Sequence, residues 1–151
     1  MNYQSKKGTA KERELIKLLA AYNYAVMRAL ASGGGTTREL PDVLAGNGDV
    51  CLAIEAKSSS KEVIYIGEEE IIDLYYFAWK YKSVPLVGVR FNIEPGDPAY
   101  GDKSNPGWYF FQPHTLYRTP KAGNYRVKKD VAIESGLTLD ELVQLTSSDF
   151  D

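Results

Sequence analysis

The sequence predicts an α/β fold in which a mixed central β-sheet is flanked by helices. Apolar residues recur at helical spacing over residues 10–22, and a second, almost wholly apolar helical segment covers residues 70–79. Residues 50–57 alternate with the two-residue period of a strand, and residues 85–91 form a continuous apolar run. The chain has 151 residues, 44% of them hydrophobic and 25% charged, which is typical of one domain of about 100–200 residues. We therefore predict a single domain.

Composition excludes several classes of function. No segment approaches the roughly 18–20 uncharged residues of a membrane span, so no membrane partner is expected. The first seven residues lack the apolar core of a signal peptide, which predicts a cytoplasmic protein. The single cysteine, Cys51, excludes an intramolecular disulfide, and the single histidine, His114, excludes a His-rich metal site. We therefore expect any chemistry to rest on carboxylates and lysine.

Charge is distributed unevenly along the chain. The net charge is −2, yet residues 1–40 carry seven Lys or Arg against three Glu, a local excess of +4. Residues 130–151 carry six Asp or Glu and no Lys or Arg. A basic N-terminal region indicates an anionic partner, although a solvated basic helix face explains the pattern equally well.

The N-terminal region is predicted to be an arm, a helix, a strand and a loop. Residues 1–7 are expected to form a flexible basic arm. Thr9 and Glu12 have the spacing of a capping box, with Thr9 as the N-cap of the first helix. A strand is predicted at 24–30, and the glycine-rich segment 32–37 is predicted to be a mobile loop.

Two strands joined by a tight turn place three charged residues together. The turn at residues 46–49 (Gly-Asn-Gly-Asp) tolerates positive φ and joins a strand that begins at Asp42 to the strand over 50–57. Glu55 and Lys57 are two residues apart on that strand, so both point to the same side. The hairpin returns the chain beside its start and can therefore set Asp42, Glu55 and Lys57 around one point.

Hydrolysis of a phosphodiester needs a group of this kind. Carboxylates are hard oxygen ligands for Mg²⁺, which polarises phosphate and lowers the pKa of the attacking water. A lysine adds positive charge where negative charge develops, or helps to place or deprotonate the water. The spacing alone is also compatible with an exposed cluster of ion pairs on an ordinary hairpin.

The helix predicted over 70–79 has almost no polar side. One small core covers only one side of a peripheral helix, and the aromatic rings on its other side would form an apolar patch larger than soluble monomers usually tolerate. We therefore predict that this helix builds the interface of a homodimer. The alternative is that a short C-terminal helix over 138–145, capped by Thr138 and Glu141, folds over it.

The rest of the chain is predicted to be strand, loop and tail. Strands are expected at 62–66 and 108–111. The segment 92–107 contains three prolines and three glycines and is predicted to be a long loop. Residues 146–151 are predicted to be a disordered acidic tail.

Several blocks of the sequence resemble a known nuclease family. The pattern Pro41-Asp42…Glu55-Ala56-Lys57 resembles the PD-(D/E)XK nuclease motif, and its surroundings are similar to archaeal-type Holliday-junction resolvases. The opening segment 7–15 resembles that family's N-terminal RKG…ERELV signature. The other matching blocks are Ala25–Ala29, Pro41–Gly48, Ile54–Lys57 and Val84–Phe91. Ordered blocks at compatible spacing over residues 6–91 are more specific than the bare motif.

This resemblance implies a restriction-endonuclease-like nuclease fold and a homodimeric, Mg²⁺-dependent endonuclease that resolves four-way DNA junctions by paired incisions, with Mn²⁺ expected to substitute. Glu12, Asp42 and Glu55 match the metal-binding carboxylates, Lys57 matches the catalytic lysine, and Ser32 lies near the place of a catalytic serine. The residues expected to contact DNA are Lys6, Lys7, Lys11, Arg13 and Arg28.

Alternatives remain at this level. A related nuclease acting on duplex or single-stranded DNA would use the same residues, and a non-catalytic junction-binding protein of the same fold would need none of them. Glu12 has two conflicting interpretations, because a carboxylate that caps Thr9 cannot freely bind metal. The loop 92–107 and the acidic tail depart from the family pattern. The resemblance implies a place with the nucleoid, or in the host cytoplasm for a viral protein, and assigns no replication or recombination partner.

Overall fold

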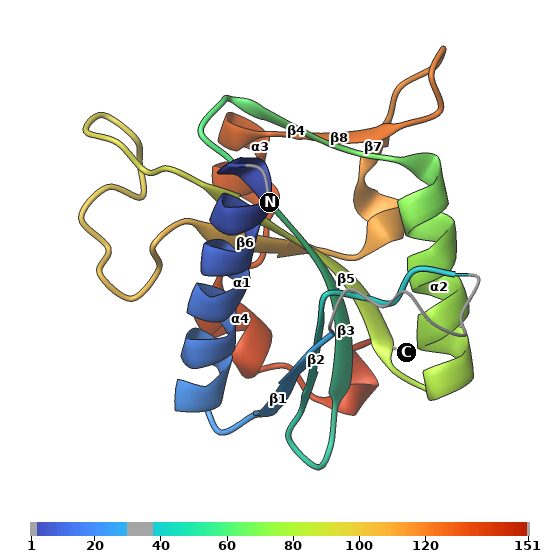
Figure 1. Cartoon of the computed structure of the whole chain (residues 1–151). Helices are drawn as coiled ribbons and strands as arrows, with labels where there is room; N and C mark the ends of the chain where they lie inside the picture. The colour runs from blue at the N-terminus through green and yellow to red at the C-terminus, as the bar shows by residue number, and fades with distance from the viewer. Residues whose placement is uncertain (1–2, 30–37, 151) are drawn as a thin grey trace.

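The computed structural model describes residues 3–29 and 38–150, with side chains from residue 8 onward (Figure 1). Its helices are α1 (Tyr3–Ala21), α2 (Glu68–Tyr81), α3 (Lys129–Ser135) and α4 (Leu139–Val143), with 3-10 turns at Pro113–Thr115 and Ser147–Phe150. Its strands are β1 (Ala25–Arg28), β2 (Val43–Gly46), β3 (Cys51–Ser59), β4 (Val63–Ile66), β5 (Val84–Phe91), β6 (Trp108–Phe111), β7 (Tyr117–Arg118) and β8 (Tyr125–Lys128).

Five strands form the central sheet, in the order β1-β2-β3-β5-β6. The first three are antiparallel, β3 and β5 are parallel, and β6 is antiparallel to β5, so the sheet is mixed as predicted. Parallel strands need a crossover connection, and the chain from β3 to β5 passes through β4 and α2. β3 is consequently central, with neighbours on both edges.

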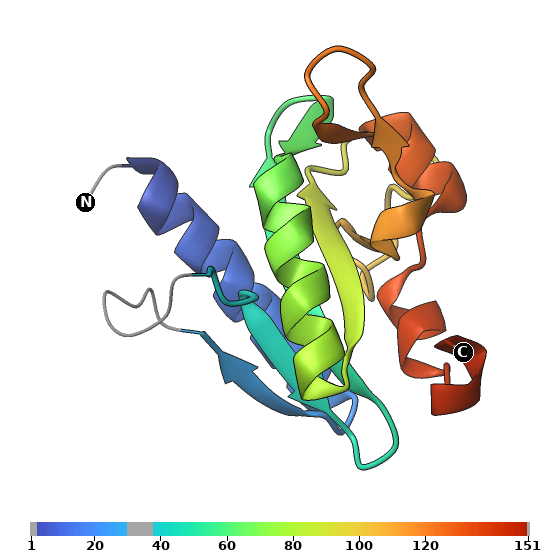
Figure 2. The same cartoon turned by 90° about the vertical axis from the view of Figure 1, so that its right-hand side faces the viewer.

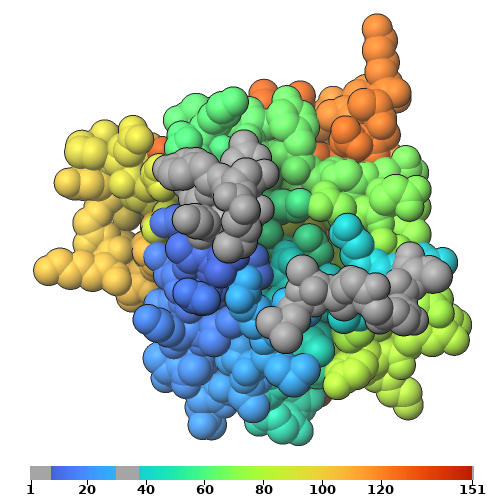
Figure 3. All heavy atoms as spheres, viewed as in Figure 1, coloured from blue at the N-terminus to red at the C-terminus, as the bar shows by residue number. Residues whose placement is uncertain are grey.

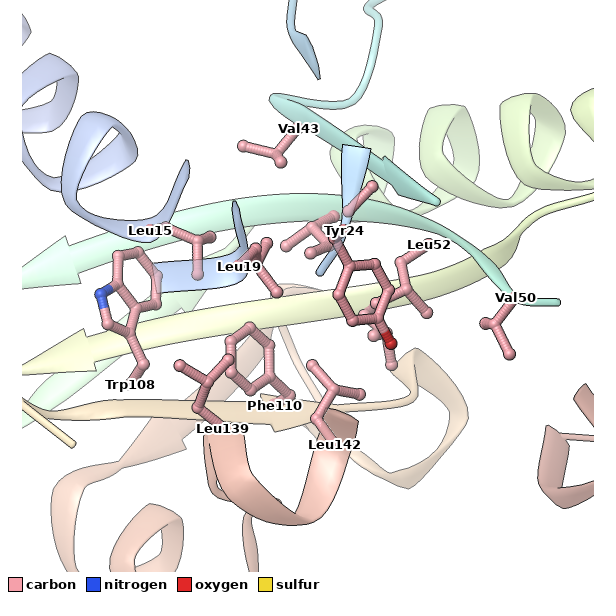
Figure 4. Packing of buried hydrophobic residues seen from close by; sticks show 13 residues of the cluster. Leu15, Leu19, Tyr24, Val43, Val50, Leu52, Trp108, Phe110, Leu139 and Leu142 are labelled. Atoms are coloured by element: carbon pink, nitrogen blue, oxygen red, sulfur yellow. The ribbon is translucent and has the colours of Figure 1, made fainter. Parts of the chain in front are cut away.

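Each face of the sheet has its own apolar core. One core packs α1 and α4 against residues from β2, β3, β5 and β6 (Figure 4). Its labelled members are Leu15, Leu19, Tyr24, Val43, Val50, Leu52, Trp108, Phe110, Leu139 and Leu142. The other core packs α2, α3 and a small sheet of order β4-β8-β7 against the opposite face. Figures 1 and 2 show α1 and α2 on opposite sides of the central sheet.

The first helix begins earlier than the sequence predicts. α1 starts at Tyr3, so the backbone of residues 3–7 is helical and is not a flexible arm. Thr9 lies inside the helix, and its hydroxyl accepts a hydrogen bond from Arg28 Nη2 at 3.2 Å. The capping-box interpretation of Glu12 is therefore wrong. Its carboxylate is available for other partners.

The C-terminal region is more ordered than predicted. α4 packs on the α1 side of the sheet, which excludes the alternative that it covers α2. The capping box of Thr138 and Glu141 is confirmed. Residues 147–150 form a 3-10 turn rather than a disordered tail, because Asp49 accepts hydrogen bonds from the backbone N–H and hydroxyl of Ser147.

The segment between β5 and β6 is a loop, as predicted, but it is fixed at two points. Asn105 is buried and accepts the backbone N–H groups of Gly107 and Trp108 at 3.0 and 2.8 Å. Lys129 of α3 pairs with Asp97 at 2.8 Å. Within residues 3–29 and 38–150, no helix is both long and apolar enough to cross a bilayer.

Candidate active site

The site forms where β3 runs beyond the end of its neighbour β2. The pairing of the two strands ends at Val43 and Ile54, so the next residues of β3 lack a β2 partner. The side chain of Asp42, immediately before β2, replaces the missing strand partner. Its Oδ2 accepts a hydrogen bond from the backbone N–H of Ala56 at 2.8 Å. This bond fixes the Asp42 carboxylate beside Glu55, as the hairpin predicts.

Glu55 is a buried acid with an altered protonation state. The residue is only 8% exposed. Burial, the negative charge of Asp42 and a hydrogen bond with Asp42 together raise its pKa to about 9, against the lowering effect of Lys57. Two close carboxylates cannot both ionise cheaply, so Glu55 keeps its proton at neutral pH.

Lys57 points to the same side of β3 and contacts the start of α2. Its Nζ donates a hydrogen bond to Oε1 of Glu70, with which it forms an ion pair. Burial by itself lowers the pKa of Lys57, but the bond to Glu70 and the charges of Glu70, Glu55 and Asp42 outweigh it and raise the pKa. Lys57 is therefore a protonated amine beside the carboxylate pair.

Glu12 reaches the site from the helix on the other side of the sheet. Its Oε1 accepts a hydrogen bond from Arg28 Nε at 3.1 Å. Partial burial and the negative charge of Asp42 raise the pKa of Glu12, against the lowering effect of Arg28. Glu12 therefore lies near enough to Asp42 to be affected by its charge, while its direct contact is with Arg28.

The donor set fits a divalent cation only in part as it stands. Among residues 3–29 and 38–150, no three His, Cys, Asp or Glu side chains are arranged to hold a metal ion. Asp42 uses one oxygen on the Ala56 backbone, and Glu12 is drawn toward Arg28. The adjoining carboxylates of Asp42 and Glu55 are nevertheless the hard oxygen ligands that Mg²⁺ prefers, and a cation would replace the proton between them.

An open pocket of about 490 Å³ adjoins these groups. Its lining comes from α1, the end of β3 and the β3–β4 turn. On the face shown in Figure 3, α1 lies beside the teal and green atoms of β3 and of that turn. The lining residues are Gly8, Lys11, Glu12, Ala56, Lys57, Ser58, Ser59, Ser60, Lys61 and Trp108. Three lysines and three serines make this a suitable surface for phosphate groups.

Comparison with known proteins identifies the family of this chain. The sequence profile of the archaeal Holliday junction resolvase (Hjc) family matches residues 3–149. The chain belongs to this family. It is 28% identical to the crossover junction endodeoxyribonuclease Hjc of Sulfurisphaera tokodaii, over 98% of this chain and 93% of that protein. It is 34% identical to the Hjc of Sulfolobus acidocaldarius, over 91% of this chain and 87% of that protein.

A solved structure confirms the fold of this Hjc family member. The structure of Archaeoglobus fulgidus Hjc, a Holliday junction resolvase, superimposes with a TM-score of 0.72 at 28% identity. The match covers 91% of this chain and 96% of the other. The restriction-endonuclease-like fold that the resemblance implied is therefore confirmed.

The structure places some predicted DNA-contact residues near the pocket. Lys11 lines it, and Arg13, two residues further along α1, is exposed. Arg28 holds Glu12 and Thr9. Ser32 and the side chains of Lys6 and Lys7 lie outside the described residues.

Two residues that the sequence analysis missed hold the site together. Glu70 binds Lys57, as described above. Glu14 of α1 accepts hydrogen bonds from Arg90 Nε and Trp108 Nε1, both at 2.8 Å. Burial alone would raise the pKa of Glu14, but Arg90 and Trp108 lower it below its ordinary value. These bonds tie α1 to β5 and β6 and so fix the position of Glu12.

Proposed function

We propose that this chain is an endonuclease that resolves four-way DNA junctions by metal-dependent hydrolysis of phosphodiesters. The observation that carries the proposal is the carboxylate pair of Asp42 and Glu55, with the protonated amine of Lys57 beside it. A binding module gains nothing from a buried, repelling pair of acids, whose ionisation is costly. Family membership supplies the substrate class, because the relatives are named crossover junction endodeoxyribonucleases.

Mg²⁺ is the proposed cofactor, and Mn²⁺ is expected to substitute. Asp42 and Glu55 would hold it, joined by Glu12 once that carboxylate leaves Arg28. When bound, the ion would polarise the phosphoryl oxygen and acidify the attacking water. Arg28, released from Glu12, would then be free to bind phosphate.

The protein's own groups complete the chemistry. Lys57 keeps its proton and therefore stabilises the negative charge that develops on the phosphoryl oxygens. Lys11 and Lys61 at the pocket edges bind flanking phosphates. Such contacts fix position without reading base sequence, which suits recognition of a junction by its shape.

We further propose that the chain acts as a homodimer through α2. The side of α2 that faces away from the core exposes large apolar residues, among which Trp79 is 74% exposed. The exposed apolar members are Ile72, Tyr75, Tyr76, Trp79 and Tyr81. A second copy would cover this face, and a two-fold dimer presents two equivalent sites to a nearly two-fold substrate.

A cleavage assay tests the proposed function. A synthetic four-way junction, a linear duplex and a single strand of the same sequence are incubated with the protein in Mg²⁺, Mn²⁺ or EDTA. We expect metal-dependent cleavage of the junction in preference to the other two. Equal cleavage of the duplex would instead make the protein a general nuclease, and junction binding without cleavage would make it a binding protein.

A further inference from the structure

Three consecutive glutamates open α2, and only the third turns toward the active site. Glu68 pairs with Arg118 at 2.6 Å, on the far side of the helix start, and Glu69 is exposed. Glu70 is half-buried and contacts Lys57. An acidic first turn is common in helices because it suits the helix dipole, so the sequence alone does not distinguish the three.

Both oxygens of Glu70 are occupied. Oε2 accepts the backbone N–H of Gly67 at 2.8 Å, and Oε1 accepts Lys57 Nζ. The bond to Gly67 satisfies one of the free donors at the start of the helix. It also fixes the carboxylate relative to the backbone, so the oxygen that faces Lys57 is held in place before any substrate binds.

Lys57 depends on a partner to fix its position more than Asp42 and Glu55 do. Asp42 is held by the Ala56 backbone and Glu55 by burial, whereas Lys57 carries its charge on a flexible four-carbon stem. Within the described residues, the ion pair with Glu70 is the direct contact of its Nζ that the structure shows. Misplacing a catalytic group by about 1 Å can cost about 100-fold in rate.

We propose that Glu70 is a positioning residue that fixes the amine of Lys57 for the chemical step. This role rests on the proposed nuclease function, in which Lys57 stabilises the transition state. Glu70 itself does not touch the substrate. It acts through Lys57, so its substitution should matter only while Lys57 is present.

The experiment is a double-mutant cycle measured as single-turnover cleavage of a four-way junction with saturating enzyme. Glu70→Ala should slow the chemical step by about 10–100-fold while the junction dissociation constant stays within about twofold. In a Lys57→Ala background the same change should cost less than about twofold, because there is no amine left to position. Glu69→Ala, an exposed neighbour in the same helical turn, is the matched control and should cleave at the wild-type rate.

Glu70→Gln separates positioning from helix capping. It keeps the length of the side chain and an acceptor oxygen but loses the charge and the second carboxylate oxygen, so an intermediate rate is expected. Thermal denaturation of each variant shows whether the fold is retained. Equal losses from Glu70→Ala with and without Lys57 would overturn the proposal, as would a wild-type rate for Glu70→Ala.

A second readout does not depend on cleavage. In NMR spectra that observe lysine ammonium groups, the Lys57 Nζ signal should shift or broaden in Glu70→Ala and stay unchanged in Glu69→Ala. An unchanged signal in both variants would contradict the proposed positioning. If wild-type protein cut no junction but the signal moved as expected, the nuclease proposal would fail while the contact of Glu70 with Lys57 stood.

Discussion

Glu55 is placed where its charge is costly and where a metal ion would make it useful. The residue is buried next to Asp42, so without a cation Glu55 retains its proton at neutral pH. The alternation of β3 predicted that Glu55 and Lys57 share a side, and the hairpin predicted that Asp42 joins them. The degree of burial was not predictable, because it depends on α2 and β5, which lie far along the chain from the motif.

Glu55→Gln should stabilise the metal-free protein. The pKa of Glu55 rises from 4.5 to about 9 on folding, so the folded state binds the extra proton and its stability falls as pH rises from about 4.5 to about 9. Glutamine keeps the hydrogen-bonding shape without that cost. In EDTA at pH 8, the melting temperature should rise by at least the roughly 2–4 °C that corresponds to 1 kcal/mol in a chain of this size. At pH 5 the gain should nearly vanish, and an equal gain at both pH values would contradict the protonation assigned to Glu55.

Lys57→Ala should slow the chemical step by roughly 10²–10³-fold, the usual effect of losing one electrostatic stabiliser of a transition state. Single-turnover kinetics with saturating enzyme isolate that step. Junction affinity, measured in parallel, should change little. A loss confined to affinity would make Lys57 a phosphate contact instead.

At the scale of elements, local patterns predicted the strands well and the ends of the helices less well. Thr9 and Glu12 have capping-box spacing, but the helix continues to Tyr3, and the two side chains instead share Arg28 of β1 as a partner. Arg28 lies 16 residues after Glu12, and the capping-box spacing does not include so distant a residue. Glu70 was missed for the same reason, since its role depends on the contact between α2 and β3.

The strand over 62–66 was predicted and is β4, but β7, β8 and α3 escaped prediction. β7 has two residues and pairs with β8, and β8 has four residues and pairs with both β4 and β7. Such short strands carry little periodicity of their own. They nevertheless complete the core that holds α2 against the central sheet.

The start of α1 should supply an electrostatic part of DNA binding. Lys11 lines the pocket, and Arg13, two residues further along α1, is exposed. Junction affinity should fall steeply with salt despite the net charge of −2. Lys11→Ala and Arg13→Ala should each reduce the slope of log K against log salt by about one, whereas Lys103→Ala, in the loop between β5 and β6, should not. An unchanged slope in both α1 variants would remove this helix from the DNA interface.

At the scale of the whole molecule, the uncovered side of α2 determines the expected assembly. Its inner side packs Ile71, Leu74 and Ala78 into the core, and Arg38 stacks on Tyr76 at 4.2 Å. The sequence predicted that one domain could not cover this helix on every side, and the exposed aromatic residues agree. What covers this face could not be predicted from the sequence. A dimer forms only if the face of α2 fits the matching face of a second copy, and a pattern within one helix does not describe that fit.

Trp79→Glu should convert a dimer into a monomer of 16.8 kDa in sedimentation equilibrium at micromolar protein. Tyr65→Glu places the same charge on another exposed aromatic position, outside α2, and should leave the dimer intact. We expect the monomer to nick one strand of a junction and to lose the paired second cut. A wild-type protein that is already an active monomer would end the interface proposal.

Single-turnover cleavage of a four-way junction in Mg²⁺ by Asp42→Asn protein, with junction binding measured on the same sample, tests most directly whether the carboxylate pair is the catalytic centre. The substitution preserves side-chain volume and removes the charge that a metal ion needs, while the phosphate contacts of α1 remain. We expect cleavage to be abolished and the dissociation constant of the junction to stay within about twofold of wild type. Near-normal cleavage by Asp42→Asn would contradict the assignment of the active site.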